Sequence, residues 1–170
     1  LSGQNIFKNI NNEYIELWTK PKKGGRSQKL IIPNKIKADK DFWIGIRLLI
    51  ADGTKPGIKN KEKGRIAFTN GDPKQIERVL KVFDLFGVDR NQWKGVVSAN
   101  SYYVQDEQKF ISNSKQYWNK NTGLNLDMIS TYFYNRKPNR IRKTLKNGTL
   151  QIRYSNIILN SILRDIINHN

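Results

Sequence analysis

Residues 72–88, DPKQIERVLKVFDLFGV, form the stretch that most narrows the folds open to this chain. Asp72 is of the residue type that caps a helix, and Pro73 suits the first helical turn. Gln75 stands where it can complete a capping box, and Gly87 is suited to end the helix. The apolar positions recur at helical spacing: Ile76, Val79, Leu80 and Phe83. A helix with one apolar face must pack on an apolar layer, so the chain has to fold into layers.

Extended runs rich in β-branched and aromatic residues can supply that layer. YIELWTK and QKLIIP, separated by PKKGGRS, predict a β-hairpin with a basic tip. A helix starting from Asp39 or Asp41 runs to Asp52 and stops at Gly53. The other expected elements, in order, are two strands within 54–70 (the second being 65–70), a strand within 92–104, a helix from Asp106 through Trp118 that closes near Gly123, a basic irregular stretch at 128–148, a strand at 149–154 and a helix at 156–167.

This order predicts an α+β fold in one domain of ordinary size. The 170 residues are enough to bury a core without metal or disulfide support. Residues 1–38 are expected to form an N-terminal basic hairpin extension. Residues 39–170 are expected to form the main domain, with an inserted helical and basic segment at about 106–147.

The composition removes several classes of chemistry. The chain has no cysteine and only one histidine, His169, which excludes thiolate or histidine metal clusters and Ser-His or Cys-His nucleophiles. Any reaction must therefore use carboxylates. Arg47 interrupts the longest apolar stretch, and no membrane span or signal peptide is visible, so we expect no membrane partner and a cytoplasmic setting, or an organellar one for an organelle-encoded gene.

The charge is strongly and unevenly positive. Against 14 acidic residues stand 31 lysines and arginines, for a net charge of +17. Residues 128–164 contain no acid, and basic residues also dominate 19–40. Such a surplus predicts a polyanionic partner, and nucleic acid is favoured over an anionic membrane surface because no basic amphipathic helix is evident.

The stretch IGIRLLIADG, residues 44–53, ends on a carboxylate followed by a helix breaker. Asp52 would lie at the negative end of the helix dipole, an unfavourable place for an acid unless a cation offsets it. A divalent metal held by oxygen ligands is the natural cation. The alternative is that Asp52 and Gly53 only form a turn after a core helix.

Two longer segments carry a resemblance to a known family. WIGIRLLIADGT, followed by GRIAFTNGDPKQIERVLKVFDLFGV, resembles the LAGLIDADG homing endonucleases, and YWNKNTGLNLDMISTYF and GTLQIRYSN extend the similarity more loosely over residues 28–165. The resemblance implies an αββαββα fold with an antiparallel DNA-binding sheet. Because the chain has one copy of the motif, the resemblance is to the single-motif, homodimeric members.

The resemblance implies a site-specific endonuclease that makes a double-strand cut. Asp52 and the backbone carbonyl of Ala51 would hold Mg²⁺, and Asn70 would lie near the attacking water. Two copies would read a pseudo-palindromic duplex site. The implied dimer interface is Gly45, Leu48, Leu49 and Ala51. Arg47 stands where relatives carry a glycine, so it would either push that interface apart or extend out of it.

Two alternatives belong to other functional classes. One is a DNA- or RNA-binding protein on the same fold that lacks cleavage, such as a regulator or an intron maturase. The other is a basic ribosome- or RNA-associated structural protein, which would bind without sequence preference.

Strand alternation nominates side chains for contact with a DNA duplex. The candidates for base contact are Lys59, Lys61, Lys63 and Arg65 on the first strand pair, Gln151 and Arg153 on the late strand, and Lys94. Lys55 is a further candidate for DNA binding. Phosphate contact is expected from the hairpin tip, with Lys20, Lys22, Lys23 and Arg26, and from the late basic loop, with Arg136, Arg140, Arg142 and Lys143.

The aromatic residues admit two interpretations. Trp43, Phe83 and Phe86 are assigned to the core. Core packing is also the expected role of most of a second group, although these could instead stack on single strands or RNA loops: Tyr102, Tyr103, Tyr132, Phe133 and Tyr134.

Overall fold

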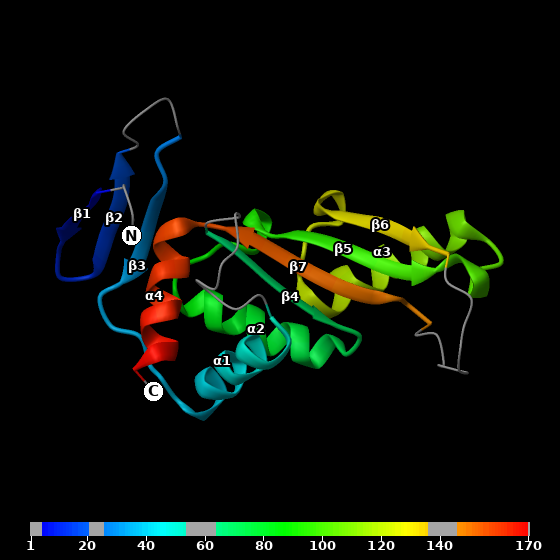
Figure 1. The fold of residues 1–170 in the computed structure, drawn as a ribbon, viewed down its shortest axis with the longest axis horizontal. Coiled ribbons are helices and arrows are strands. Elements are labelled where there is room, and N and C mark those ends of the chain that lie inside the picture. Colours follow the sequence, from blue (N-terminus) through cyan, green and yellow to red (C-terminus); the bar gives the residue numbers. More distant parts are fainter. Residues whose placement is uncertain (1–4, 21–25, 54–63, 136–145, 170) are drawn as a thin grey trace.

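The computed structural model describes residues 5–20, 26–53, 64–135 and 146–169. Within these ranges the chain has the predicted α+β composition, with two sheets and four α-helices (Figure 1). The strands are β1 (Asn5–Ile10), β2 (Tyr14–Lys20), β3 (Lys29–Pro33), β4 (Arg65–Asn70), β5 (Lys94–Asn100), β6 (Ile129–Tyr134) and β7 (Thr149–Ser155). The helices are α1 (Lys40–Asp52), α2 (Pro73–Leu85), α3 (Glu107–Thr122) and α4 (Ile157–Asn168).

The smaller sheet is antiparallel, with the order β1-β2-β3. The predicted hairpin is confirmed as β2 and β3, and β1 adds a strand that the sequence analysis did not anticipate. Helix α4 lies beside this sheet in Figure 1, and the amide of its first residue, Ile157, donates to Oε1 of Gln28, just before β3, at 2.6 Å. The N-terminal extension therefore shares its core with the C-terminal helix.

The larger sheet has the order β4-β7-β5-β6 and is mixed. Strand β7 is antiparallel to both β4 and β5, whereas β6 runs parallel to β5. The expectation of a purely antiparallel sheet is therefore wrong. Helix α3 provides the crossover between β5 and β6, the type of connection that a parallel pair requires.

Strand β6 also corrects the expectation that residues 128–148 are irregular throughout. Its Ile129, Thr131 and Phe133 alternate with the more exposed Ser130, Tyr132 and Tyr134. Phe133 packs on Phe110 of α3 with ring centroids 5.7 Å apart. Burial alternates along this edge strand because α3 covers only one of its faces.

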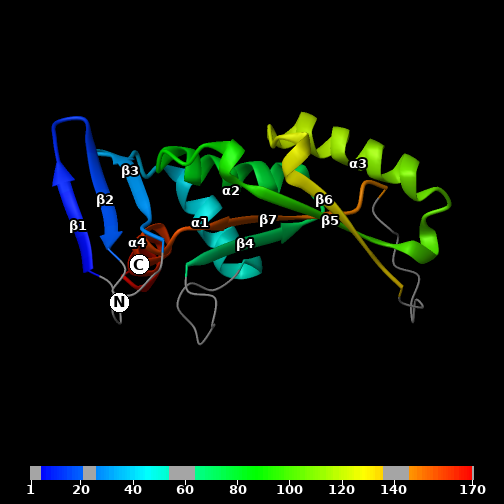
Figure 2. The ribbon, with the colours of Figure 1, turned by 90° about the horizontal axis from the view of Figure 1, so that it is seen from above.

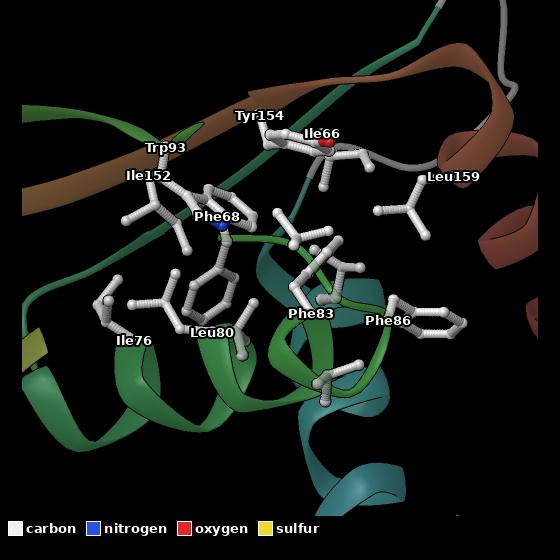
Figure 3. Packing of buried hydrophobic residues seen from close by; sticks show 14 of the residues in the cluster. Ile66, Phe68, Ile76, Leu80, Phe83, Phe86, Trp93, Ile152, Tyr154 and Leu159 are labelled. Carbon is white, nitrogen blue, oxygen red and sulfur yellow. The ribbon is translucent and has the colours of Figure 1, made fainter. Parts of the chain in front are cut away.

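Helices α2 and α3 lie along one side of the larger sheet (Figure 2). The core between them and the strands contains Phe68, Phe83, Trp93 and Ile152, all buried (Figure 3). Trp93 meets Phe83 edge to face with centroids 4.8 Å apart. The predicted burial of Phe83 and Phe86 is confirmed, while Trp43 is half-buried against the core.

The predicted helix ends are largely confirmed. Asp39 caps α1, Asp72 caps α2, and Gly87, with φ +72°, follows the end of α2. The capping box does not form, because the Asp72 amide donates to Oδ1 of Asn70 and the Gln75 side chain accepts from Arg78. The expected strand before β4 falls mostly on residues 54–63, outside the described residues. No helix in the described ranges is long and apolar enough to cross a membrane.

Helices α1 and α2 approach closely at Gly45. A Cβ atom built there would lie 2.4 Å from Cγ2 of Val82 and 2.9 Å from the Arg78 carbonyl oxygen. Backbone cannot withdraw as easily as a side-chain end, so the contact requires glycine. Gly45 therefore joins α1 to α2 within one chain.

We expect Gly45→Ala to lower the free energy of unfolding by about 1–2 kcal/mol. Overpacking costs about 1–3 kcal/mol, and the better helix propensity of alanine offsets up to about 1 kcal/mol. Denaturant melts would measure the change. The control Arg47→Ala, on the exposed side of the same helix, should stay within about 0.5 kcal/mol of the original chain. Equal stability of the two variants would contradict the close contact.

Candidate nucleic-acid interface

The side of the larger sheet away from α2 and α3 is called the open face below. Register and alternation place on it one set of side chains: Arg65, Ala67 and Thr69 of β4, Thr149, Gln151 and Arg153 of β7, Lys94, Val96 and Ser98 of β5, and Ser130, Tyr132 and Tyr134 of β6. All except Ala67 are half-buried or exposed. The four described candidates for base contact, Arg65, Lys94, Gln151 and Arg153, therefore share one face.

A polar network runs across the open face between β4 and β7. Nε2 of Gln151 donates to Oγ1 of Thr69 at 2.9 Å, and Nε of Arg153 donates to Oε1 of Gln151 at 2.5 Å. Arg153 lies opposite Lys94 in the register of β5 and β7. Gln151 thus orients the guanidinium group of Arg153 beside a second cation, an arrangement suited to phosphate oxygens or guanine edges.

No residue of the four strands in this sheet is acidic. Instead, the carboxylates of Asp39, Asp72, Asp89 and Asp106 each accept a backbone N–H at the start of a helical segment. These bonds satisfy amides that a helix start leaves without a partner. The positive surplus is therefore not balanced by any carboxylate on the sheet strands themselves.

Arg90 is a cation with a structural role. Its guanidinium bonds Glu77 at 2.7 Å and Asp84 at 2.6 Å, and also reaches the Thr122 carbonyl at 2.5 Å. Burial alone would lower the pKa of Arg90, but the bonds to both carboxylates outweigh it and raise the pKa. Arg90 therefore joins α2 to the end of α3.

Asp52 is the last residue of α1 and is exposed. Helix α1 ends at the β4 edge of the sheet, where Gly53 forms a bridge with Phe68 and its amide donates to the Leu49 carbonyl at 2.9 Å. The last turn of α1 contains no basic residue, and no partner of the Asp52 carboxylate is found among the described residues. The carboxylate thus lies at the negative end of a helix dipole, and the last turn of that helix supplies no cation to offset it.

The donor set at the end of α1 fits a hard cation in part. The exposed Asp52 carboxylate and the exposed Ala51 residue offer oxygen ligands of the type that Mg²⁺ prefers. Within the described ranges, no three acidic, histidine or cysteine side chains gather as a ready-made metal cluster. One copy would therefore supply few of the six ligands, leaving the rest to water, phosphate or a second copy.

Asn70 does not lie on the open face. It is half-buried at the end of β4 opposite Leu150, in phase with the buried Phe68, and its Oδ1 accepts the Asp72 amide at 2.9 Å. Asn70 therefore organises the turn into α2. The turn before a capped helix needs such a side-chain acceptor, and the expectation that Asn70 lies near the attacking water stays a prediction.

The four residues proposed for a dimer contact divide into two pairs. Gly45 and Leu49 are buried in the core of the chain itself, where α1 packs on α2. Leu48 is half-buried and Ala51 is exposed, as is Arg47. A second copy would therefore meet the side of α1 that carries Leu48 and Ala51, and Arg47 is free to extend into solvent.

Most of the candidates for base or phosphate contact lie outside the described residues: Lys22, Lys23, Lys55, Lys59, Lys61, Lys63, Arg136, Arg140, Arg142 and Lys143. Lys20 and Arg26 are described and exposed on either side of the hairpin tip. Lys20 also places its Nζ 5.0 Å from the centre of the Phe7 ring. These two residues remain candidates for phosphate contact.

The core assignment of the second aromatic group is wrong for four of its five members. Tyr102 and Tyr132 are 63% and 59% exposed, and Tyr103 and Tyr134 are also exposed, while Phe133 packs on α3. The hydroxyl groups of Thr69, Ser98 and Thr149 on the open face were not predicted from the sequence. Alternation along each strand contained this signal, but only the sheet register places these groups together.

Comparisons with known proteins give no relative: no family model, curated protein or solved structure matches the chain.

Proposed function

We propose that this chain is a site-specific DNA endonuclease of the LAGLIDADG type, which cuts both strands of a duplex as a homodimer in the presence of Mg²⁺. One observation carries the proposal. An acid-free sheet face with Arg65, Lys94 and Arg153 ends at an edge where an exposed carboxylate, Asp52, terminates a helix. Such an enzyme needs two parts: cations that bind phosphates and a carboxylate that can hold a metal.

In this proposal the open face binds the duplex. Lys94 and the paired Arg153 lie side by side on adjacent strands, so they present positive charge at the spacing of a sheet ladder. The bond from Arg153 to Gln151 on the same face of β7 restricts the guanidinium group, which lowers the entropy lost when that group engages DNA. Arg65, at the first position of β4, extends the cationic row along the sheet edge.

Asp52 and the Ala51 carbonyl would hold Mg²⁺, which would activate a water molecule and stabilise the developing charge on the scissile phosphate. The negative end of the α1 dipole supports cation binding at this place. The exposure of Asp52 leaves room for a phosphate and for ligands from a second chain.

Homodimerisation follows from the number of metal-binding carboxylates in each chain. Each copy contributes one such carboxylate, whereas a double-strand cut needs two reactive centres. A twofold axis near the ends of two α1 helices would bring both Asp52 residues to the duplex. Arg47, exposed on α1, can point away from that axis.

A second candidate is a DNA- or RNA-binding regulator or intron maturase without cleavage. The exposed tyrosines at the end of β5 and β6 favour it, because aromatic side chains outside the core suit unpaired bases more than a duplex. Such a protein would keep the open face and have no need of Asp52.

Selection from a randomised duplex library separates the candidates. We expect bound molecules to share two related half-sites, with two chains per site, and Mg²⁺ to yield molecules cut within that site. Sequencing of bound and cut fractions gives both results, and EDTA is the control for cleavage. Enrichment of one sequence without a cut in Mg²⁺ or Mn²⁺ would favour the second candidate, and binding without enrichment would contradict both.

A further inference from the structure

Four exposed tyrosines gather at one end of the larger sheet. Tyr132 and Tyr134 lie on the open-face side of β6, opposite Ser98 and Asn100 of β5. Tyr102 and Tyr103 follow β5 directly and contact each other edge to face, with centroids 5.5 Å apart. Exposed aromatic side chains grouped in this way mark an interaction surface rather than ordinary solvent exposure.

We infer that this end of the open face binds unpaired bases of a nucleic-acid strand, which stack on Tyr132 and Tyr134. The inference rests on the proposed role of the sheet as a nucleic-acid surface and assigns a strand chemistry to one part of it. Stacking on tyrosine requires a free base face, which a closed duplex does not offer along its length.

The spacing of the two tyrosines supports unpaired bases. Same-face residues two positions apart on a strand are separated by about 6.7 Å. Stacked bases in a duplex rise by only about 3.4 Å. Tyr132 and Tyr134 are therefore about twice too far apart for neighbouring bases in a stack, and they suit bases that have been splayed from one another.

The surroundings favour nucleic acid over a protein partner. Tyr132 lies in one row with Ser98 and Thr149, whose hydroxyl groups can donate to and accept from base edges. Lys94 lies four residues before Ser98 on β5, about 13 Å away along the strand. A sugar-phosphate backbone can therefore lie on the cations while its bases reach the tyrosines.

Binding of labelled oligo(dT) and oligo(U), followed by fluorescence anisotropy, tests the inference. We expect Tyr132→Ala and Tyr134→Ala each to weaken binding roughly tenfold, the usual order for loss of one stacked base, and the double variant to lose more. An abasic oligomer of equal charge should bind the original chain as weakly as the double variant binds oligo(dT). Tighter binding of oligo(U) would identify the strand as RNA, and tighter binding of oligo(dT) would identify it as DNA.

Three further variants separate stacking from other roles. Tyr132→Phe should retain binding, Tyr132→Leu should lose it despite its apolar side chain, and Tyr14→Ala, an exposed tyrosine of the smaller sheet, should bind like the original chain. Unchanged melting temperatures would confirm that the exposed positions leave the fold intact.

Equal affinity for oligo(dT) and the abasic oligomer would overturn the inference, and so would a double variant that binds oligo(dT) like the original chain. The proposed endonuclease activity is tested by a different result, the cutting of duplex DNA. A chain that cuts duplex but ignores the oligomers loses this inference alone. A chain that binds oligomers through its tyrosines but neither binds nor cuts duplex keeps the inference and loses the proposed function.

Discussion

Cleavage of the selected duplex in Mg²⁺ should disappear in Asp52→Asn, while binding is retained. The amide keeps the shape of the carboxylate but lacks the charge that a hard divalent cation requires. Removing a negative charge near phosphates should leave DNA affinity equal or higher. Stability should rise by a few tenths of a kcal/mol, because an acid leaves the negative end of an exposed helix dipole. Nicking, binding and melting measured on one preparation give all three results.

Helix α1 provides a matched control for this change. Asp41 is an exposed acid in its first turn, where the dipole favours negative charge. Asp41→Asn should therefore lower stability slightly and leave cleavage in place, the reverse of both effects expected at Asp52. A destabilised Asp52→Asn variant that still cuts would show that this residue only shapes the turn before β4.

Helix limits were predictable because their signals are local. Asp106 caps α3 by accepting the Lys109 amide at 2.9 Å, and Gly123 ends it with φ +66°. Both residues act within one turn of the backbone that they bond, so the sequence contains the whole interaction. The same holds for Asp39 and Asp72.

Strand pairing was less predictable because its partners are distant. Residues 129–134 alternate as a strand should, but their parallel pairing with β5 depends on a crossover through α3. Because basic residues typical of a loop follow this segment, the whole of residues 128–148 was predicted to be irregular. Gly45 shows the same limit in a helix, since its small size is required by Val82 and Arg78 on a different element.

The candidate interface was predictable in composition and less so in geometry. Period-2 alternation placed Gln151 and Arg153 on the same side of one strand, as the structure has them. That this pair lies next to Lys94 and Thr69 follows only from the strand order, in which β7 lies between β4 and β5. The sequence alone does not give that order. The hydrogen bond that the Asn70 side chain accepts from the Asp72 amide was not predicted from the sequence.

Replacing Arg65, Lys94 and Arg153 together with alanine should weaken duplex binding and flatten its salt dependence. Each lost phosphate contact removes about 0.9 from the slope of log affinity against log salt, so three contacts remove up to about 2.7 units. At about 0.1 M salt this corresponds to a loss of roughly two to three orders of magnitude in affinity, and the two proteins should converge as salt approaches about 1 M. Titrations of labelled duplex at several salt concentrations measure both quantities.

The control for this triple variant changes net charge equally on the helix-covered side. Lys74 and Lys81 of α2 and Lys120 of α3 are exposed, and their replacement by alanine removes the same three charges. A long-range effect of net charge would weaken both triple variants alike, since it acts wherever the charges lie. Direct contact predicts a reduced slope for the open-face variant and a slope close to that of the original chain for the control. Equal slopes in the two variants would remove the open face as the DNA-binding surface, because the register that places Arg153 beside Lys94 would then have no bearing on phosphate binding.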